Sequence, residues 1–132
     1  MSQYEIKKAL VTKLLSLTLP ALNYDNLAST EVVPFVDVFI FFSQPSVATL
    51  GADGEDGQSG FLQLTLNMPI DDGDGATFAL YETIAQEFKA GSKCLFGDQQ
   101  VTISNCGKGS GITQDGKYIT PITINWYART RR

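Results

Sequence analysis

The stretch from Gly60 to Gly91 constrains the fold most, because its apolar residues change from strand spacing to helical spacing. Over residues 61–68, apolar side chains alternate with Gln63, Thr65 and Asn67, which predicts a strand buried on one face. Pro69 ends this strand, since proline cannot donate to a central ladder. An acidic glycine loop follows at residues 71–75. Apolar residues then recur in steps of three and four, at Phe78, Tyr81, Ile84, Ala85 and Phe88.

The ends of this second predicted helix carry recognisable signals. Asp74 is placed to cap the first turn, where a carboxylate also meets the positive end of the helix dipole. Lys89 and Gly91 are typical of a helix C-terminus. The chain therefore continues from strand through loop to helix within about thirty residues.

A first helix is predicted near the N-terminus. Ser2 and Glu5 have the spacing of a capping box, and Pro20 cannot continue a helix. Between them, apolar residues form one stripe at helical spacing: Ile6, Ala9, Leu10, Leu14 and Leu17. We expect a helix from Gln3 to Leu17 or Thr18, followed by a polar connection over residues 20–31.

The most hydrophobic segment is residues 32–42, which are β-branched, aromatic and nearly continuous after Pro34. Such a strand is usually buried on both faces. If helices cover one face of the sheet, something else must cover the other, and in a chain of this size that is often another subunit.

The C-terminal part predicts a β-meander. Short strands are expected at residues 93–96 and 99–105, joined through a glycine-rich turn or flexible loop at 107–111 to a hairpin. In that hairpin, residues 112–114 and 117–128 flank Asp115-Gly116, a strong two-residue turn signal. Pro121 places part of the last strand near an edge or a bulge.

Together these elements predict one α+β domain over residues 1–132. Its sheet is mostly antiparallel, with four to six strands and two helices packed on one face. Two segments stand outside this core. Residues 43–60 predict a long mobile loop with an acidic, glycine-rich centre, and residues 129–132 predict a short basic tail.

The charge distribution is more informative than the net charge of -4. Residues 14–88 contain no lysine or arginine, yet they hold eleven of the fourteen acidic residues. The bases flank this middle segment on both sides. Two interpretations stay open: either folding scatters these charges over the surface, or the domain has an acidic side and a basic side that would let copies associate head to tail.

Several kinds of site lack the residues they need. The absence of histidine removes Ser-His-Asp and Cys-His catalysis and the commonest metal ligand. Cys94 and Cys106 cannot form an ordinary zinc site alone, and we expect reduced thiols. The acidic glycine runs 53–57 and 71–75 resemble calcium loops but lack the full EF-hand spacing. We therefore expect no enzyme activity, no metal and no cofactor.

The sequence also limits the partners that are not proteins, namely membranes and nucleic acids. No apolar run approaches the roughly 18 residues of a membrane span, and lysines interrupt the N-terminal apolar residues, so we expect a cytosolic protein without membrane contact. The arginines Arg129, Arg131 and Arg132 could touch nucleic acid, but they are too few for autonomous DNA binding by an acidic protein. They are a frayed terminus or a contact to a neighbouring subunit.

The chain resembles the small tail-terminator proteins of long-tailed phages, also called tail completion or minor tail proteins of the lambda-like kind. The resemblance covers nearly the whole chain in length and element order. It is most specific in residues 60–69, in the stretch from the glycine loop to residues 85–91, and in the ending Pro121-Ile122-Thr123-Ile124-Asn125-Trp126-Tyr127.

The resemblance implies a structural protein of the virion tail, assembled in the host cytoplasm. Such proteins form a ring, typically a hexamer, on the head-proximal end of the finished tail tube. The implied partners are other copies of the chain, the tail-tube protein and the head-connector protein. DNA would pass through the lumen without specific binding, and the acidic middle of the chain could line that lumen.

We predict that eight residues take part in subunit or partner contacts: Phe39, Phe41, Asp53, Glu55, Asp56, Arg129, Arg131 and Arg132. Two other functions stay open. One is a tail-tube or head–tail joining subunit, which shares the same architecture. The other is a small binding module unrelated to phage, using calcium through residues 53–57 or 71–75.

Overall fold

The computed structural model of the protein describes residues 3–17, 21–24, 35–43, 46–47, 55–70, 75–97, 99–114 and 116–131. Within these ranges the elements are, in chain order, α1 (Gln3–Leu15), β1 (Ala21–Tyr24), β2 (Phe35–Phe42), β3 (Ser46–Val47), β4 (Glu55–Pro69), α2 (Gly75–Glu87), β5 (Lys93–Phe96), β6 (Gln99–Lys108), β7 (Ile112–Gln114) and β8 (Lys117–Arg131).

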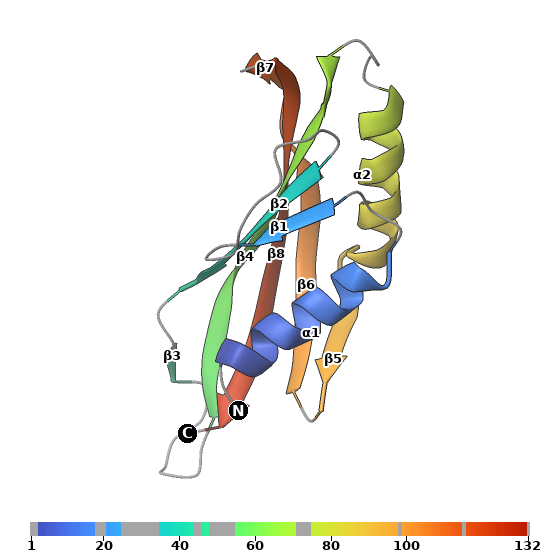
Figure 1. Ribbon diagram of the computed structural model, residues 1–132. Coiled ribbons are helices and arrows are strands. Elements are labelled where there is room, and N and C mark those ends of the chain that lie inside the picture. Colours follow the sequence, from blue (N-terminus) through green and yellow to red (C-terminus); the bar gives the residue numbers. More distant parts are fainter. Residues whose placement is uncertain are drawn as a thin grey trace.

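The strands form one sheet built around the long antiparallel pair β4 and β8 (Figure 1). The main path runs in the order β1-β2-β4-β8-β6-β5, while β3 pairs with β4 and β7 pairs with β8. β1 and β2 are parallel, and the remaining pairs between described strands are antiparallel. The predicted α+β fold with a mostly antiparallel sheet is therefore confirmed.

Both helices pack on the same face of the sheet, as predicted. In Figure 1, α1 crosses the lower half over β5 and β6, and α2 runs along the upper half. Strand residues on this inner face are almost fully buried, among them Leu62, Leu64, Leu66, Ile122, Ile124 and Trp126. The helices complete the same core with Ile6, Ala9, Leu10, Leu14, Ile84 and Phe88.

The central strand β4 begins earlier than its sequence pattern predicts. The alternation starts at Phe61, but the strand starts at Glu55, so residues 55–60 are not part of the predicted loop. The reason is tertiary: this segment lies opposite residues 126–131 of β8, whose ladder supplies its hydrogen bonds. Residues 44–45 and 48–54, the rest of that loop apart from Ser43 and β3, lie outside the described residues.

The predicted basic tail is likewise strand in its described part. Arg129 and Arg131 belong to β8, opposite Gly57 and Glu55 respectively, while Arg132 lies outside the described residues. The prediction of a tail was wrong for 129–131 because the partner strand β4 is itself longer than expected.

Smaller differences concern short strands and turns. β1 lies within the predicted polar connection and pairs with β2, and β6 continues to Lys108. The hairpin prediction is confirmed: Gln114 pairs with Lys117, and Gly116 has a φ of 76° in the turn. Pro121 lies in the central strand β8, where its carbonyl accepts a hydrogen bond from the amide of Gly109, beyond the end of β6.

The predicted apolar stripe of α2 packs on the core at Ile84 and Phe88, with Tyr81 partly buried against it, and Phe78 is the exception. Phe78 was expected in the buried stripe, but it is 46% exposed, whereas Thr77 is buried. The buried side follows Thr77, Ile84 and Phe88, which recur at seven- and four-residue steps and leave Phe78 to one side. The Lys108 amine lies 4.5 Å from the Phe78 ring centroid, so this aromatic ring meets a cation rather than the core.

A side chain from α1 binds to one edge of the sheet. β5 is the last strand of the path and pairs only with β6 among the described strands. The amine of Lys13 donates a hydrogen bond of 3.3 Å to the carbonyl of Lys93 in that strand. Lysine on a sheet edge opposes the addition of a further strand.

Candidate interaction surface

The second face of the sheet, here called the outer face, is covered by neither helix. Alternate residues of the three adjacent strands β2, β4 and β8 form it: Asp37, Phe39, Phe41, Phe61, Gln63, Thr65, Thr123, Asn125 and Tyr127. Within the described chain this face of β2 is open, because Phe39 is 43% exposed and Phe41 is 45% exposed, so its predicted covering by another subunit stays a prediction.

Three aromatic rings on this face form what we call the phenylalanine cluster: Phe39, Phe41 and Phe61. The register of β2 and β4 places Phe41 directly opposite Phe61. Their rings stack with centroids 5.1 Å apart, and the Phe39 ring lies 6.2 Å from that of Phe61. Ordered aromatic rings with large exposed areas are typical of surfaces that bind another protein.

Polar contacts hold the strands around the cluster. The Asn67 amide donates to the carboxylate of Asp37 across β2 and β4, at 3.3 Å, and to the carbonyl of Thr65, at 3.0 Å. On β8, the Asn125 amide donates to the side-chain oxygen of Asn105 at 2.6 Å. These bonds tie the outer face into a defined shape, which a binding surface needs for complementarity.

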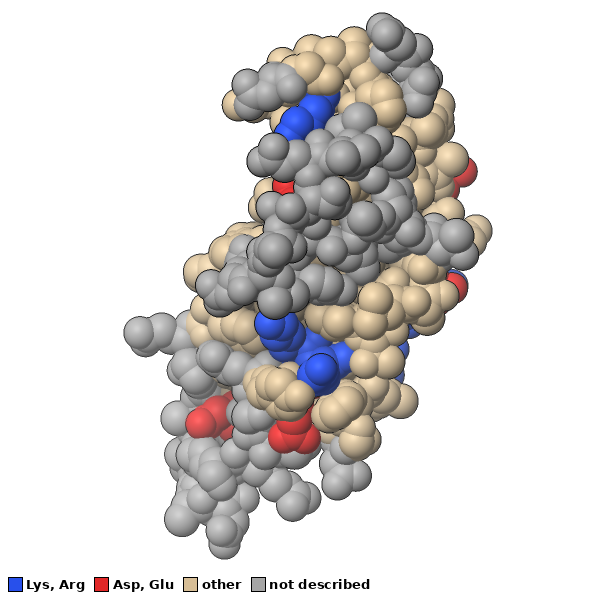
Figure 2. Space-filling model, in the orientation of Figure 1, with Lys and Arg blue, Asp and Glu red and all other residues tan. Residues whose placement is uncertain are grey.

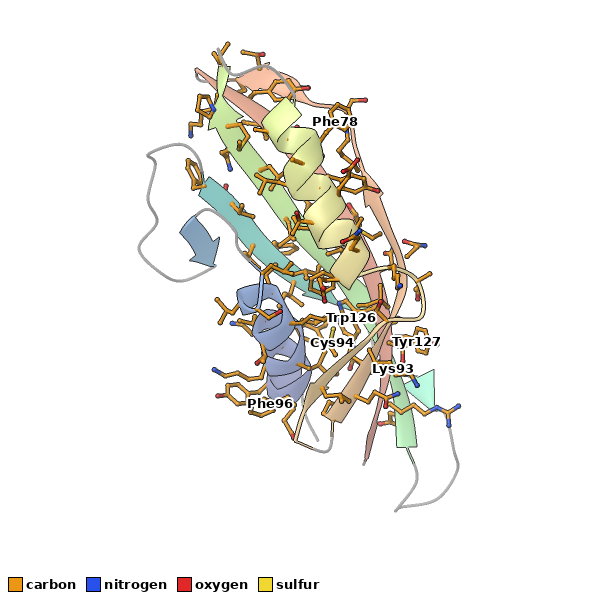
Figure 3. All side chains as sticks on the ribbon, turned by 90° about the vertical axis from the view of Figure 1, so that its right-hand side faces the viewer. Phe78, Lys93, Cys94, Phe96, Trp126 and Tyr127 are labelled. Atoms are coloured by element: carbon orange, nitrogen blue, oxygen red, sulfur yellow. The ribbon has the colours of Figure 1, made fainter. Side chains whose placement is uncertain are left out.

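Gly60 lies where the phenylalanine cluster and the core meet. A Cβ at this position would collide with the backbone carbonyl oxygen of Phe41 and would lie 2.9 Å from the Trp126 ring. Only glycine lets β2 and β4 approach here above the tryptophan. Figure 3 shows Trp126 on the side of the sheet that carries α1 and Tyr127 on the opposite side.

The structure places the predicted contact residues in two groups. Phe39 and Phe41 lie on the outer face. The charged residues lie at the start of β4 and the end of β8, where Glu55 is opposite Arg131 and exposed Arg129 is opposite Gly57. Half-buried Asp56 is in β4, and Asp53 and Arg132 lie outside the described residues.

This register brings acidic and basic segments of one chain together. Sequence reasoning treated residues 53–56 and 129–132 as separate acidic and basic contacts. Instead, Glu55 and Arg131 occupy facing positions on neighbouring strands.

Two outer-face aromatics escaped the sequence reasoning. Phe61 occupies the same alternation phase as Gln63 and Thr65, so a phenylalanine on an otherwise polar face was the available signal. Tyr127 is 51% exposed on the same face of β8. The register, which sequence alone did not supply, joins Phe61 to Phe39 and Phe41.

A second apolar surface lies on α1, on the side away from the sheet. Tyr4 is 62% exposed, Leu15 is 63% exposed and half-buried Val11 lies between them. With Lys8 they recur in steps of four, three and four residues, so they form one stripe, the α1 stripe. The Lys8 amine lies 5.5 Å from the Tyr4 ring centroid.

The two cysteines are free thiols, as expected. Burial raises the pKa of the Cys94 thiol to about 11, although the nearby Lys13 amine acts in the opposite direction. Burial also raises the pKa of Cys106. Both thiols are therefore protonated and poor nucleophiles near neutral pH.

Metal and membrane sites find no support in the described residues. No group of three acidic, cysteine or histidine side chains in the described ranges could hold a metal ion. Residues 53–54 and 71–74 of the two acidic runs fall outside those ranges. Neither described helix is long and apolar enough to cross a membrane.

Comparison with known proteins gives one family and one fold. A family model described as "Phage tail terminator protein" matches residues 5–126. One solved structure superposes with a TM-score of 0.79 over 97% of this chain and 96% of its own, at 18% sequence identity, which shows a shared fold. No curated protein matches the chain significantly.

Proposed function

Because this chain belongs to the phage tail terminator family, we propose that it forms a ring capping the head-proximal end of the tail tube. There it ends tube polymerisation and provides the surface to which the head connector attaches. Membership of the family gives the protein a structural role in the phage tail and makes it a component of the virion. The ring and its two attachments are the proposed part.

The observation that carries the proposal is the uncovered phenylalanine cluster. The inner face of the same sheet is sealed by two helices, whereas Phe39 and Phe41 keep nearly half of their surface exposed. A subunit that works alone gains nothing from such a surface, whereas a subunit of an assembly buries it against a neighbour. This supports a self-associating protein.

The proposed partners are other copies of the chain, in a ring that we expect to be a hexamer, then the tail-tube protein and the head-connector protein. Assembly takes place in the host cytoplasm. DNA passes through the lumen without specific binding. We further propose that the predicted contact residues act in these interfaces: Phe39, Phe41, Asp53, Glu55, Asp56, Arg129, Arg131 and Arg132.

The first experiment is light scattering of the purified protein over a wide concentration range at two salt concentrations. We expect one discrete species of ring size, in equilibrium with free subunits. Open-ended growth would instead favour the alternative of a tail-tube subunit. Weakening of the discrete species by salt would show that charged residues contribute to the contacts.

A second experiment tests the cap directly. Labelled protein is added to purified tail tubes that lack heads, and bound label is located by electron microscopy. We expect label at one end of each tube and no further growth when tube protein is supplied. Label along the tube wall, or tubes that continue to grow, would contradict the proposal.

A further inference from the structure

We infer that the α1 stripe of one copy packs on the phenylalanine cluster of the next copy, so that neighbouring subunits associate head to tail. This inference rests on the proposed ring and names the two surfaces that would form it. The occupant of the outer face is therefore a second copy of this chain, presented through its first helix.

The positions of the two surfaces require head-to-tail association. α1 packs on the inner face of the sheet, and its stripe points away from that sheet. The phenylalanine cluster lies on the outer face. Because the two surfaces lie on opposite sides of one subunit, a dimer would leave one surface of each copy uncovered. Each copy therefore contacts one neighbour through its helix and another through its outer face, which generates a closed ring or a filament.

The dimensions of the two surfaces agree. From Tyr4 to Leu15 the stripe rises about 16 Å along the helix axis. From Asp37 to Phe41 the β2 part of the outer face extends about 13 Å, and β2 to β8 spans about 10 Å across the strands. A helix about 10 Å wide therefore covers the cluster on β2 and β4 when it lies along the strands.

Charge favours this pairing. Lys8 of the α1 stripe and the neighbouring Lys7 are exposed, and Figure 2 shows basic side chains gathered over α1. The β2 and β4 part of the outer face contains no lysine or arginine, and exposed Asp37 lies two residues before Phe39. Lys8 of the helix can thus meet Asp37, while the basic groups of the same face lie to either side of the cluster, with Lys117 over the Phe35 ring and exposed Arg129 two residues beyond Tyr127.

The test uses two variants with complementary defects. The face variant carries Phe39→Ser and Phe41→Ser, and the helix variant carries Tyr4→Ser and Leu15→Ser. All four side chains are exposed, so each monomer should fold, which circular dichroism verifies. Phe78→Ser is the matched control, because Phe78 is 46% exposed but lies on α2, on neither surface.

Sedimentation velocity of each variant, alone and mixed, up to millimolar concentration gives the decisive measurement. Each variant alone should stay monomeric, with self-association weakened at least about tenfold relative to the unmodified protein. An equimolar mixture should form a one-to-one pair and nothing larger, since only one intact interface remains. The Phe78→Ser control should assemble like the unmodified protein.

Other outcomes overturn the inference. A helix variant that still pairs with itself would show that outer faces pack on each other. A mixture without pairs, or an unmodified protein that stays monomeric at millimolar concentration, would exclude the contact. If both variants still form rings, the contact is wrong but the proposed ring stands, whereas failure to cap tubes would count against the proposed function alone.

Discussion

The inner and outer faces of the sheet are made by alternate residues of the same strands, yet they differ in what covers them. On the inner face, Leu62, Leu64 and Trp126 are at most 1% exposed beneath two helices. On the outer face, Phe39, Phe41 and Tyr127 are 43% to 51% exposed. The two helices therefore bury one face, while these aromatic residues of the other face stay exposed in the described chain.

The difference also separates two uses of hydrophobic side chains. Inner residues stabilise the monomer through burial, at about 25 cal/mol for each Å² of apolar surface removed from water. Outer phenylalanines gain only part of that energy until a partner arrives. Truncation of a similar apolar side chain should thus lower the stability of the monomer on the inner face and weaken assembly on the outer face.

The largest expected effect is on the inner face. Leu64→Ala removes a fully buried side chain between β2 and β8 and should lower the free energy of unfolding by about 2–5 kcal/mol. Urea denaturation measures the change. Thr123→Ala, on the outer face of the adjacent strand, is the control and should cost less than about 1 kcal/mol. Equal losses of unfolding free energy at both positions would show that the two faces do not differ in their contribution to stability.

Gly60→Ala tests the point where both faces meet. The added methyl group must displace the backbone at Phe41 or the Trp126 ring, so unfolding should become easier by about 1–3 kcal/mol, and Phe41 should shift. Gly107→Ala is a matched strand control, because nothing lies within 4 Å of its Cβ position. A neutral Gly60→Ala would mean that the two strands tolerate a wider spacing.

Sequence alone identified most of this contrast, but not all of it. Strand alternation in residues 61–68 correctly separated the inner leucines from the polar outer residues. Sequence could not show that Phe61 meets Phe41, because register depends on long-range pairing. It also missed residues 55–60 and 129–131 as strand, since glycine and charge give weak local signals that the β4–β8 ladder overrides.

The candidate surface was predicted less completely than the fold. Phe39 and Phe41 were identified by the unusual hydrophobicity of β2, although burial on both faces was expected. The α1 stripe was missed because the buried stripe of the same helix accounted for its helical pattern. Exposure of Tyr4 and Leu15 became evident only when the sheet showed which side of α1 it covers.

A pH titration should sharpen the description of the inner face. The pKa of Cys94 rises from its ordinary value of 9.0 to about 11 on folding, so the folded state favours the protonated thiol. Its contribution to stability is complete below pH 9 and falls by about 2 kcal/mol as the pH approaches 11. Between pH 8 and pH 11 the free energy of unfolding should fall less for Cys94→Ala than for the unmodified protein. Parallel curves of unfolding free energy against pH would contradict this.

The smallest effect on the monomer is expected on the outer face. Phe41→Ala removes more atoms than Leu64→Ala, but it should lower the free energy of unfolding by only about 1 kcal/mol, because the ring loses its stacking on Phe61 and little burial. Thermal or urea denaturation at a dilution that keeps the protein monomeric measures this. A cost as large as that of Leu64→Ala would show that the cluster belongs to the core.

The hydrogen bond from Lys13 to the carbonyl of Lys93 has a consequence for the fate of free subunits. An open β5 edge would recruit strands from other chains into fibrous aggregates. The lysine amine occupies an acceptor that such a strand would need. A single side chain of α1 thus opposes fibrous aggregation through this edge.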